Sequence, residues 1–392
     1  MENFDFYSPT YFAFGHGRER EAGKYARQFG ARKVLLHYGG GSVVRSGLLD
    51  RVKESLLAAS LPFVELGGVQ PNPRSELVYE GIRLARGENV DFILAVGGGS
   101  VIDSAKAIAL GALADGDFWD FYTGAREIGG ALPLGAVLTI AAAGSEGSGN
   151  SVITRDGLKR STGSDALRPK FSIMNPELTA TLSPYQVACG GADIMAHVFE
   201  RYFTNTKGVE TTDRLCEGLL LSLVSELPKA VANPADYDAQ ANIMWAGMLA
   251  HNNAVGVGRA QDWASHSIEH EMSAMYGIAH GAGLAVVFPA WMKYVLGHDA
   301  ARFVRLAGTV FGISGDGRDP ADVALEGVDA LKAFWRSLGL PTTFAELGGR
   351  EEDIPRLAAN VMLGNRRAAG GAIGGFTRLS VADVEKIYAL MK

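Results

Sequence analysis

Two short apolar runs that each end in Gly-Gly-Gly-Ser constrain the fold of this chain more than any other feature. The first run is KVLLHY (33–38) and the second begins DFILAV (91–96). Each run has the length of a buried strand, and helical spacing follows each glycine cluster. Strands that alternate with helices in this way predict βαβ units, a parallel sheet and right-handed crossovers.

The character of the chain changes near residue 182. Before it, further strands are predicted at 5–14 (an edge strand or hairpin), 62–66 and 132–139, with helices at 19–29, 43–59, 75–88 and 101–114. After it, strand-like runs stop and helices are predicted at 184–204, 210–232, 236–252, 261–274, 281–296, 299–311, 319–338, 351–363 and 380–391. We therefore predict an α/β dinucleotide-binding domain over 1–182 and a helical domain over 183–392.

Composition narrows the class of protein. A length of 392 residues suits two domains, and the net charge of −6 gives no electrostatic footprint for nucleic acid or an anionic membrane. No uncharged apolar run reaches eighteen residues, so we expect no membrane span. Cys189 and Cys216 form no CxxC pair, and the N-terminus has no basic-plus-apolar signal. These features predict a cytoplasmic protein.

The glycine clusters are candidate phosphate sites. Between a strand and a helix, glycines let the backbone wrap a phosphate, and the helix N-terminus offers N–H groups to it. A plain βα turn is the alternative, but the strand–helix context favours dinucleotide binding. The loop 141–150, AAAGSEGSGN, has similar composition, and for it a plain connection is the stronger interpretation. The candidates are Gly39, Gly40, Gly41, Ser42, Gly97, Gly98, Gly99 and Ser100.

The residues after the first strand bear on the choice of cofactor. An acidic residue at such a strand end commonly holds the ribose 2′-hydroxyl of NAD. YGGGSVVR (38–45) has no acid there but offers Ser42 and Arg45, which suit a 2′-phosphate. We therefore favour NADP(H) over NAD(H), with a solvated Arg45 as the alternative.

Five residues could hold a metal ion. His266 and His270 are four apart on one predicted helix face, and His280 follows Gly277 across a turn. Asp193 and His197 are likewise four apart on another helix. One aspartate with three histidines suits Fe(II) or Zn(II), and a catalytic metal keeps one position open, so four would bind and one would stand beside the ion. The alternative is a set of surface or internally bonded residues, which is how we interpret His16, His37, His251 and His298.

Together these residues resemble the iron-containing (group III) alcohol dehydrogenase family over almost the whole chain. The resemblance is carried by GGGSVIDSAKAIA (97–109), PKFSIMNPELT (169–179), Asp-x3-His and His-x3-His-x9-His. It implies a dehydroquinate synthase-like fold with the active site in the cleft between the domains. The chain departs from the family pattern at two places. The loop that begins at Thr139 usually reads nearer Thr-x-x-Gly-Thr-Gly-Ser-Glu in the family, and the family has aspartate at the position of Asn175.

The resemblance also implies roles for individual residues. The metal ligands would be Asp193, His197, His266 and His280, and His270 would stand beside the metal as a proton-relay or substrate-contacting catalytic residue. Gly97, Gly98, Gly99 and Ser100 would hold the pyrophosphate, Asp103 would lie near the ribose, Thr139 would border the cofactor, and Lys159 would approach the nicotinamide ribose. Within the family, the segment YGGGS (38–42), which has no acid at the strand end, resembles the branch that contains NADPH-dependent butanol dehydrogenases and aldehyde reductases.

The predicted function is therefore a metal-dependent, NADPH-linked alcohol dehydrogenase or aldehyde reductase acting on substrates such as butanol and butanal. The metal would polarise the substrate oxygen, and the protein would act as a homodimer. An NAD-dependent glycerol or diol dehydrogenase is an alternative, disfavoured by the missing acid near Gly39. A dehydroquinate synthase would need a cluster of basic residues around the metal motifs, and the sequence has no such cluster. Maleylacetate reductase-like enzymes work without a metal, and the full set of candidate ligands argues against that activity. A non-catalytic metal-binding or nucleotide-binding protein is a further alternative. For Trp263 and Phe203, core packing is favoured over lining a substrate pocket.

Overall fold

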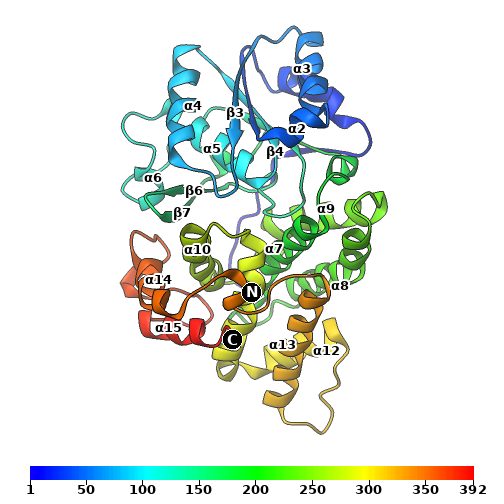
Figure 1. Cartoon of the computed structure of the whole chain (residues 1–392), viewed down its shortest axis with the longest axis vertical. Helices are drawn as coiled ribbons and strands as arrows, with labels where there is room; N and C mark the ends of the chain where they lie inside the picture. Colours follow the sequence, from blue (N-terminus) through cyan, green and yellow to red (C-terminus); the bar gives the residue numbers. More distant parts are fainter. The chain divides into compact units, whose positions relative to one another are not determined.

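The computed structural model describes residues 1–392, apart from the side chain of residue 369. The chain divides into two compact units, Tyr7–Thr181 and Leu182–Lys392, and the second also includes Met1–Phe6. The first unit is an α/β structure and the second is helical, as the colours along the chain show (Figure 1). The predicted fold class, an α/β part followed by an all-α part, is confirmed.

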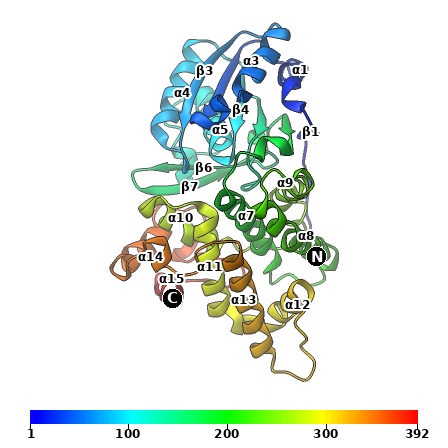
Figure 2. The ribbon, with the colours of Figure 1, turned by 45° about the vertical axis from the view of Figure 1, so that its right-hand side comes forward.

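The first six residues belong to a different unit from the one predicted for them. Met1–Phe6 was assigned to the α/β domain by its place in the sequence, but it belongs to the helical unit. The Met1 ammonium group donates to the carbonyl oxygen of Lys207 at 2.8 Å, and Glu2 N donates to Gly258 O at 2.9 Å. Figure 2 shows the N-terminus near helix α8 of that unit. These hydrogen bonds reach residues 206 and 256 positions later, and no local pattern in the sequence indicates them.

The α/β unit is built on a six-stranded sheet in which every pairing is parallel. The strand order is β1-β8-β5-β4-β2-β3. The strands are β1 Tyr11–Phe14, β2 Val34–Gly39, β3 Phe63–Val69, β4 Phe92–Gly97, β5 Leu134–Leu138 and β8 Phe171–Met174. The helices are α1 Ala22–Gln28, α2 Gly41–Arg45, α3 Leu48–Ala58, α4 Ser75–Gly87, α5 Gly99–Leu113 and α6 Asp120–Thr123. Each residue of β4 is buried, which explains its continuous apolar run.

Three loops meet at one edge of this sheet. β2 and β4 are neighbours and pair Tyr38 with Val96, so both Gly-Gly-Gly-Ser clusters follow adjacent carboxyl ends. β5 lies on the other side of β4 and pairs Leu138 with Gly97, which brings the loop that starts at Thr139 to the same edge. In open parallel sheets, ligands bind at the carboxyl ends of the strands.

Several elements of the α/β unit differ from the predictions. The predicted helix 43–59 is two helices, α2 and α3, because Gly47 between them adopts a left-handed φ of 67°. Strand 5–14 is only β1, an edge strand without a hairpin. The antiparallel hairpin β6 Asn150–Arg155 and β7 Leu158–Gly163 was not predicted, nor was β8. The hairpin turn is Asp156-Gly157, and both residues have positive φ, as a type I′ turn requires.

The helical unit contains a helix at each position predicted for it. Its helices are α7 Pro184–Tyr202, α8 Glu210–Ala232, α9 Tyr237–His251, α10 Ala264–Tyr276, α11 His280–Val295, α12 Ala300–Phe311, α13 Pro320–Ser337, α14 Ile354–Met362 and α15 Val381–Ala389. α7 packs against α8 and α11, and α10 packs against α11 (Figure 2). Phe203 is fully buried among Tyr202, Trp291 and Phe303, so it is a core residue. Among the described residues, none of the helices is both long and apolar enough to cross a bilayer.

His37 in β2 is a structural residue, buried between the sheet and α5. Its Nδ1 lies 2.8 Å from Leu66 O, and its Nε2 lies 2.9 Å from Ser104 Oγ. A carbonyl only accepts, so Nδ1 donates and Nε2 accepts from the serine, which defines a neutral tautomer. Burial lowers the pKa of His37 from 6.5 to about 4.

We predict that His37 makes the protein less stable as the pH falls from 6.5 to 4. Over this window the unfolded chain binds the proton and the folded chain does not, so the free energy of unfolding decreases, by about 3 kcal/mol at most. The variant His37→Gln, which cannot titrate, should lose less stability over the same window. Urea unfolding with a metal chelator present measures this, and His16→Gln, at an exposed histidine of the same unit, is the control. Equal pH slopes in His37→Gln and the wild type would contradict the prediction.

Candidate metal centre and nucleotide loops

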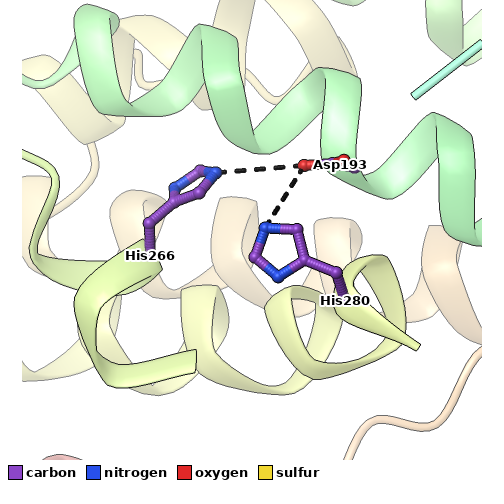
Figure 3. Close-up of side chains that lie close together, drawn as sticks. All are labelled: Asp193, His266 and His280. Atoms are coloured by element: carbon purple, nitrogen blue, oxygen red, sulfur yellow. Dashed lines mark ion pairs between the residues drawn. The ribbon is translucent and has the colours of Figure 1, made fainter. Parts of the chain in front are cut away.

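Three helices of the helical unit bring Asp193, His266 and His280 together. Asp193 lies on α7, His266 on α10, and His280 is the first residue of α11. Nε2 of His266 lies 3.9 Å from Asp193 Oδ1, and Nε2 of His280 lies 3.7 Å from the same oxygen (Figure 3). Asp193 and His266 are buried and His280 is partly buried. These are three of the four predicted metal ligands.

Glycines allow the three helices to approach so closely. At Gly281, which follows His280, a Cβ atom would collide with the backbone carbonyl of Cys189 on α7. At Gly283, a Cβ atom would lie 2.6 Å from Glu269 Oε1 on α10. The sequence His-Gly-Ala-Gly therefore sets the start of α11 directly against the other two helices.

The fourth predicted ligand, His197, faces the same carboxylate. Its Nδ1 lies 3.7 Å from Asp193 Oδ1, and its ring stacks on that of His266 with centroids 4.8 Å apart. Burial first, and then the neighbouring His251 and His266, hold the pKa of His197 well below 6.5. A neutral His197 has a nitrogen lone pair to offer to a cation.

The polar atoms at this point fit a divalent metal ion. Among the residues described, Asp193 Oδ1, His197 Nδ1 and His266 Nε2 are buried atoms without a hydrogen-bond partner. One such atom costs about 1–3 kcal/mol, and native proteins contain few of them. These three atoms converge from two helices, and they form a set of oxygen and nitrogen ligands of the kind that binds Fe(II) and Zn(II).

Two buried glutamates complete the cluster, and neither was identified from the sequence. Glu200 Oε1 accepts from His266 Nδ1 at 2.7 Å, and Glu269 Oε2 accepts from Nδ1 of His280. Burial lowers the pKa of His266, but the nearby carboxylates of Asp193 and Glu200 outweigh this effect and leave the pKa above 6.5. Spacing was an available signal, because residues 193, 197 and 200 fall on one face of α7, and residue 269 is one turn after 266.

His270 and His251 border the cluster. The ring centroid of His270, the predicted catalytic residue, lies 5.5 Å from that of His280 and 6.5 Å from that of His266. The ring of His251 lies 4.1 Å from that of His197, and Arg201 Nη2 lies 3.2 Å from His251 Nδ1. His251 therefore belongs to the surroundings of the site, although the sequence offered no partner for it.

In the α/β unit, the cluster 97–100 has the form of a phosphate-binding loop. The fifteen-residue helix α5 begins at Gly99. At Gly98 a Cβ atom would collide with Ile140, and at Gly99 it would come within 2.8 Å of the Ala143 Cβ. The loop after β5 therefore lies directly beside the helix N-terminus, where only glycine leaves room for a ligand to approach the backbone.

A buried lysine, which was also not identified from the sequence, holds that loop in place. Lys106 on α5 is fully buried, and its Nζ donates to the carbonyl oxygens of Ser145, Ser148 and Asn150 at 2.7–2.8 Å. Asp103, one turn earlier, accepts from Ser145 Oγ at 2.6 Å and from Val152 N at 3.0 Å. Both oxygens of Asp103 are thus bonded within the protein. The signal in the sequence was a lysine in the otherwise apolar stretch AKAIALGAL.

The other predicted cofactor residues lie on separate elements of the α/β unit. Thr139 N donates to Gly97 O at 3.2 Å, which ties the end of β5 to the glycine cluster. Lys159 on β7 is buried, and its Nζ donates to Asn72 Oδ1 at 2.9 Å. Ser42 and Arg45 are exposed, and the Arg45 guanidinium group lies over Gly41, where a side chain would collide with it.

Comparisons with known proteins identify the family to which this chain is related. Residues 9–176 match the family described as iron-containing alcohol dehydrogenase, and residues 187–391 match the C-terminal domain of the Fe-containing alcohol dehydrogenase family. The chain is 42% identical over 389 residues to the probable NADH-dependent butanol dehydrogenase 1 of Bacillus subtilis, with 99% of each protein covered. It is 39% identical over 363 residues to the NADPH-dependent aldehyde reductase YqhD of Escherichia coli, covering 91% of this chain and 92% of that protein. The crystal structure of NADH-dependent butanol dehydrogenase A from Thermotoga maritima matches with a TM-score of 0.96 at 42% identity, over 100% of this chain and 98% of that one. The predicted family and fold class are confirmed.

We predict that His266→Ala removes the bound metal. The substitution deletes one of the converging nitrogens, and loss of a ligand should lower metal affinity by at least the 10–100-fold typical of changes in the surrounding shell. Metal analysis of the purified variant, with the rate of aldehyde reduction, measures the effect. His298→Ala, at a histidine outside the cluster, is the control. Full metal content and unchanged reduction in His266→Ala would show that the site is wrong.

We predict that Lys106→Met weakens dinucleotide binding and leaves the metal content unchanged. Three loop carbonyls would lose their donor, and the loop beside Gly98 and Gly99 would no longer be fixed. Each buried acceptor left unpaired costs about 1–3 kcal/mol, so we expect KM for the dinucleotide to rise about tenfold or more. Steady-state kinetics and metal analysis distinguish the two sites, and an unchanged KM would refute this role for Lys106.

Proposed function

The chain belongs to the iron-containing alcohol dehydrogenase family, and we propose that it is a metal-dependent, NADPH-linked alcohol dehydrogenase and aldehyde reductase. We propose primary alcohols and aldehydes such as butanol and butanal as its substrates. The observation that carries the proposal is the convergence of Asp193 Oδ1 with the Nε2 atoms of His266 and His280, within 3.9 Å. The names of the relatives, which are butanol dehydrogenases and an aldehyde reductase, support the substrate class.

Each unit has a distinct task in this proposal. Asp193, His197, His266 and His280 would hold a divalent ion, which when bound supplies Lewis-acid stabilisation of negative charge on the substrate oxygen. Gly97, Gly98, Gly99 and Ser100 would bind the pyrophosphate of the dinucleotide, whose nicotinamide supplies the hydride. His270, buried beside His280, would carry the proton to or from the substrate oxygen.

We propose NADPH rather than NADH on the residues after β2. The sequence Tyr38-Gly-Gly-Gly-Ser42 has no carboxylate there to accept from a ribose 2′-hydroxyl. Ser42 and Arg45 are both exposed, and the Arg45 guanidinium group lies over Gly41, the residue before Ser42. A hydroxyl and a guanidinium group suit a 2′-phosphate, which arginine can bind through two parallel hydrogen bonds. One relative named above is NADH-dependent and another is NADPH-dependent, so Ser42 and Arg45 carry this part of the proposal.

The activity is tested with the purified protein, its metal analysed, and NADPH and NADH compared on a series of straight-chain aldehydes. We expect NADPH consumption with butanal, its loss after chelation, and its return when Fe(II) or Zn(II) is added. A protein that binds metal and NADPH but turns over none of the aldehydes would be a non-catalytic binder, and the proposed activity would be rejected.

We predict that Arg45→Ala raises KM for NADPH and leaves KM for NADH nearly unchanged. A hydrogen bond to a charged group contributes about 1.5–3 kcal/mol, which corresponds to a rise of roughly 10–100-fold. Arg83→Ala removes the same charge from the surface of α4 in the same unit and serves as the control. If Arg45→Ala raises both KM values equally, Arg45 does not recognise the 2′-phosphate.

A further inference from the structure

We propose that Glu200 and Glu269 are positioning residues of the metal centre, each fixing the ring of one histidine ligand. This inference rests on the metal site of the proposed function. Each carboxylate holds the Nδ1–H of its histidine, so that Nε2 is the nitrogen directed at Asp193. No contact between Glu200 or Glu269 and the metal is required.

Glu200 joins α7 to the first turn of α10. It is 1% exposed, and its Oε1 accepts from both the Nδ1 and the backbone N of His266, at 2.7 and 2.9 Å. Its Oε2 accepts from the backbone N of Trp263 at 2.5 Å. Trp263 precedes α10 with a left-handed φ of 66° and no side-chain cap. Glu200 therefore supplies the cap of α10 from another helix and fixes the His266 ring with the same carboxylate.

Glu269 fixes the ring of His280, the first residue of α11, through a corresponding hydrogen bond. It is fully buried, its Oε2 accepts from His280 Nδ1, and its Oε1 accepts from Ser273 Oγ. Gly283 lets α11 lie against the Glu269 side chain, as described above. Glu200 and Glu269 come from different helices and serve different histidines, yet both bind Nδ1 and leave Nε2 toward Asp193.

The chemistry of a carboxylate explains why this arrangement suits a metal ligand. An ionised carboxylate only accepts, so it keeps the proton on Nδ1 and leaves the lone pair on Nε2. Metal-binding histidines commonly donate their other N–H to such a group, which orients the ring and makes the ligand more basic. The carboxyl groups of Asp193, Glu200 and Glu269 are also buried, each beside a histidine of this cluster, and a cation would offset their charge.

The test is metal affinity in Glu200→Gln and Glu269→Gln, measured by competition of Zn(II) or Co(II) with a chelator. Glutamine keeps the size and an acceptor oxygen but removes the charge. We expect the Kd for Zn(II) to rise about 10–100-fold in each variant, and the visible spectrum of bound Co(II) to change. The thermal midpoint of the metal-free protein reports folding separately.

A matched control is Glu217→Gln in the same helical unit. Glu217 is also 1% exposed and bonded by other side chains, accepting from Tyr202 Oη and Arg305 Nε, but it contacts none of the histidines. We expect this variant to lose stability and keep its affinity for Zn(II). Wild-type affinity and Co(II) spectrum in both Glu200→Gln and Glu269→Gln would overturn the inference. If Glu200→Gln does not fold, Glu269→Gln alone decides by the same measurements.

The failure of this inference is distinguishable from the failure of the proposed function. If His266→Ala abolishes metal binding but neither glutamate variant changes it, the metal site stands and the positioning role is rejected. If His266→Ala itself keeps the metal, the site on which both rest is rejected.

Discussion

Polar atoms buried without partners around Asp193 are the physical constraint on which the helical unit depends. A folded chain avoids such atoms, and here Asp193 Oδ1, His197 Nδ1 and His266 Nε2 converge from helices distant in sequence. Packing alone would not favour this arrangement, since apolar side chains at these positions would be less costly to bury. The cluster therefore leaves an oxygen and two nitrogen atoms whose bonding capacity a divalent cation would satisfy. The glycines at 281 and 283, which remove side chains from the helix contacts, serve the same arrangement.

The α/β unit is arranged around a different requirement, which is a site for a dinucleotide. A dinucleotide needs backbone N–H groups and space, and a parallel sheet provides both where strands end and helices begin. β2, β4 and β5 are neighbours, so three loops open on one edge. The loop after β5 has little side-chain volume of its own, and the buried Lys106 anchors it through three carbonyl oxygens. Burial lowers the pKa of that lysine to about 8, because the charged ammonium group loses its hydration there.

Predictions from the sequence succeeded where structure follows local periodicity. Helical spacing located α7 to α15, and the apolar runs located β2 and β4, because burying one face of a helix or both faces of a strand leaves a pattern in neighbouring residues. They failed where a single backbone conformation decides, as at Gly47, which divides a predicted helix, and at Asp156-Gly157, which turns an unpredicted hairpin. The Asp-Gly pair was a usable signal for that hairpin. Met1–Phe6 was misassigned because its hydrogen bonds are to residues 206 and 256 positions away.

The sequence by itself determined the class of fold, the glycine loops and the list of histidines and acids from which a metal site would be drawn. Spacing of four residues on a helix says which side chains share a face, and this is a local property. Only the tertiary structure decided which way those faces turn. It set His266 and His280 around Asp193, placed His251 against His197, and brought Glu200 and Glu269 behind the two rings. Those contacts depend on how α7, α10 and α11 pack, and close packing is a property of the assembled helices that no short stretch of sequence contains.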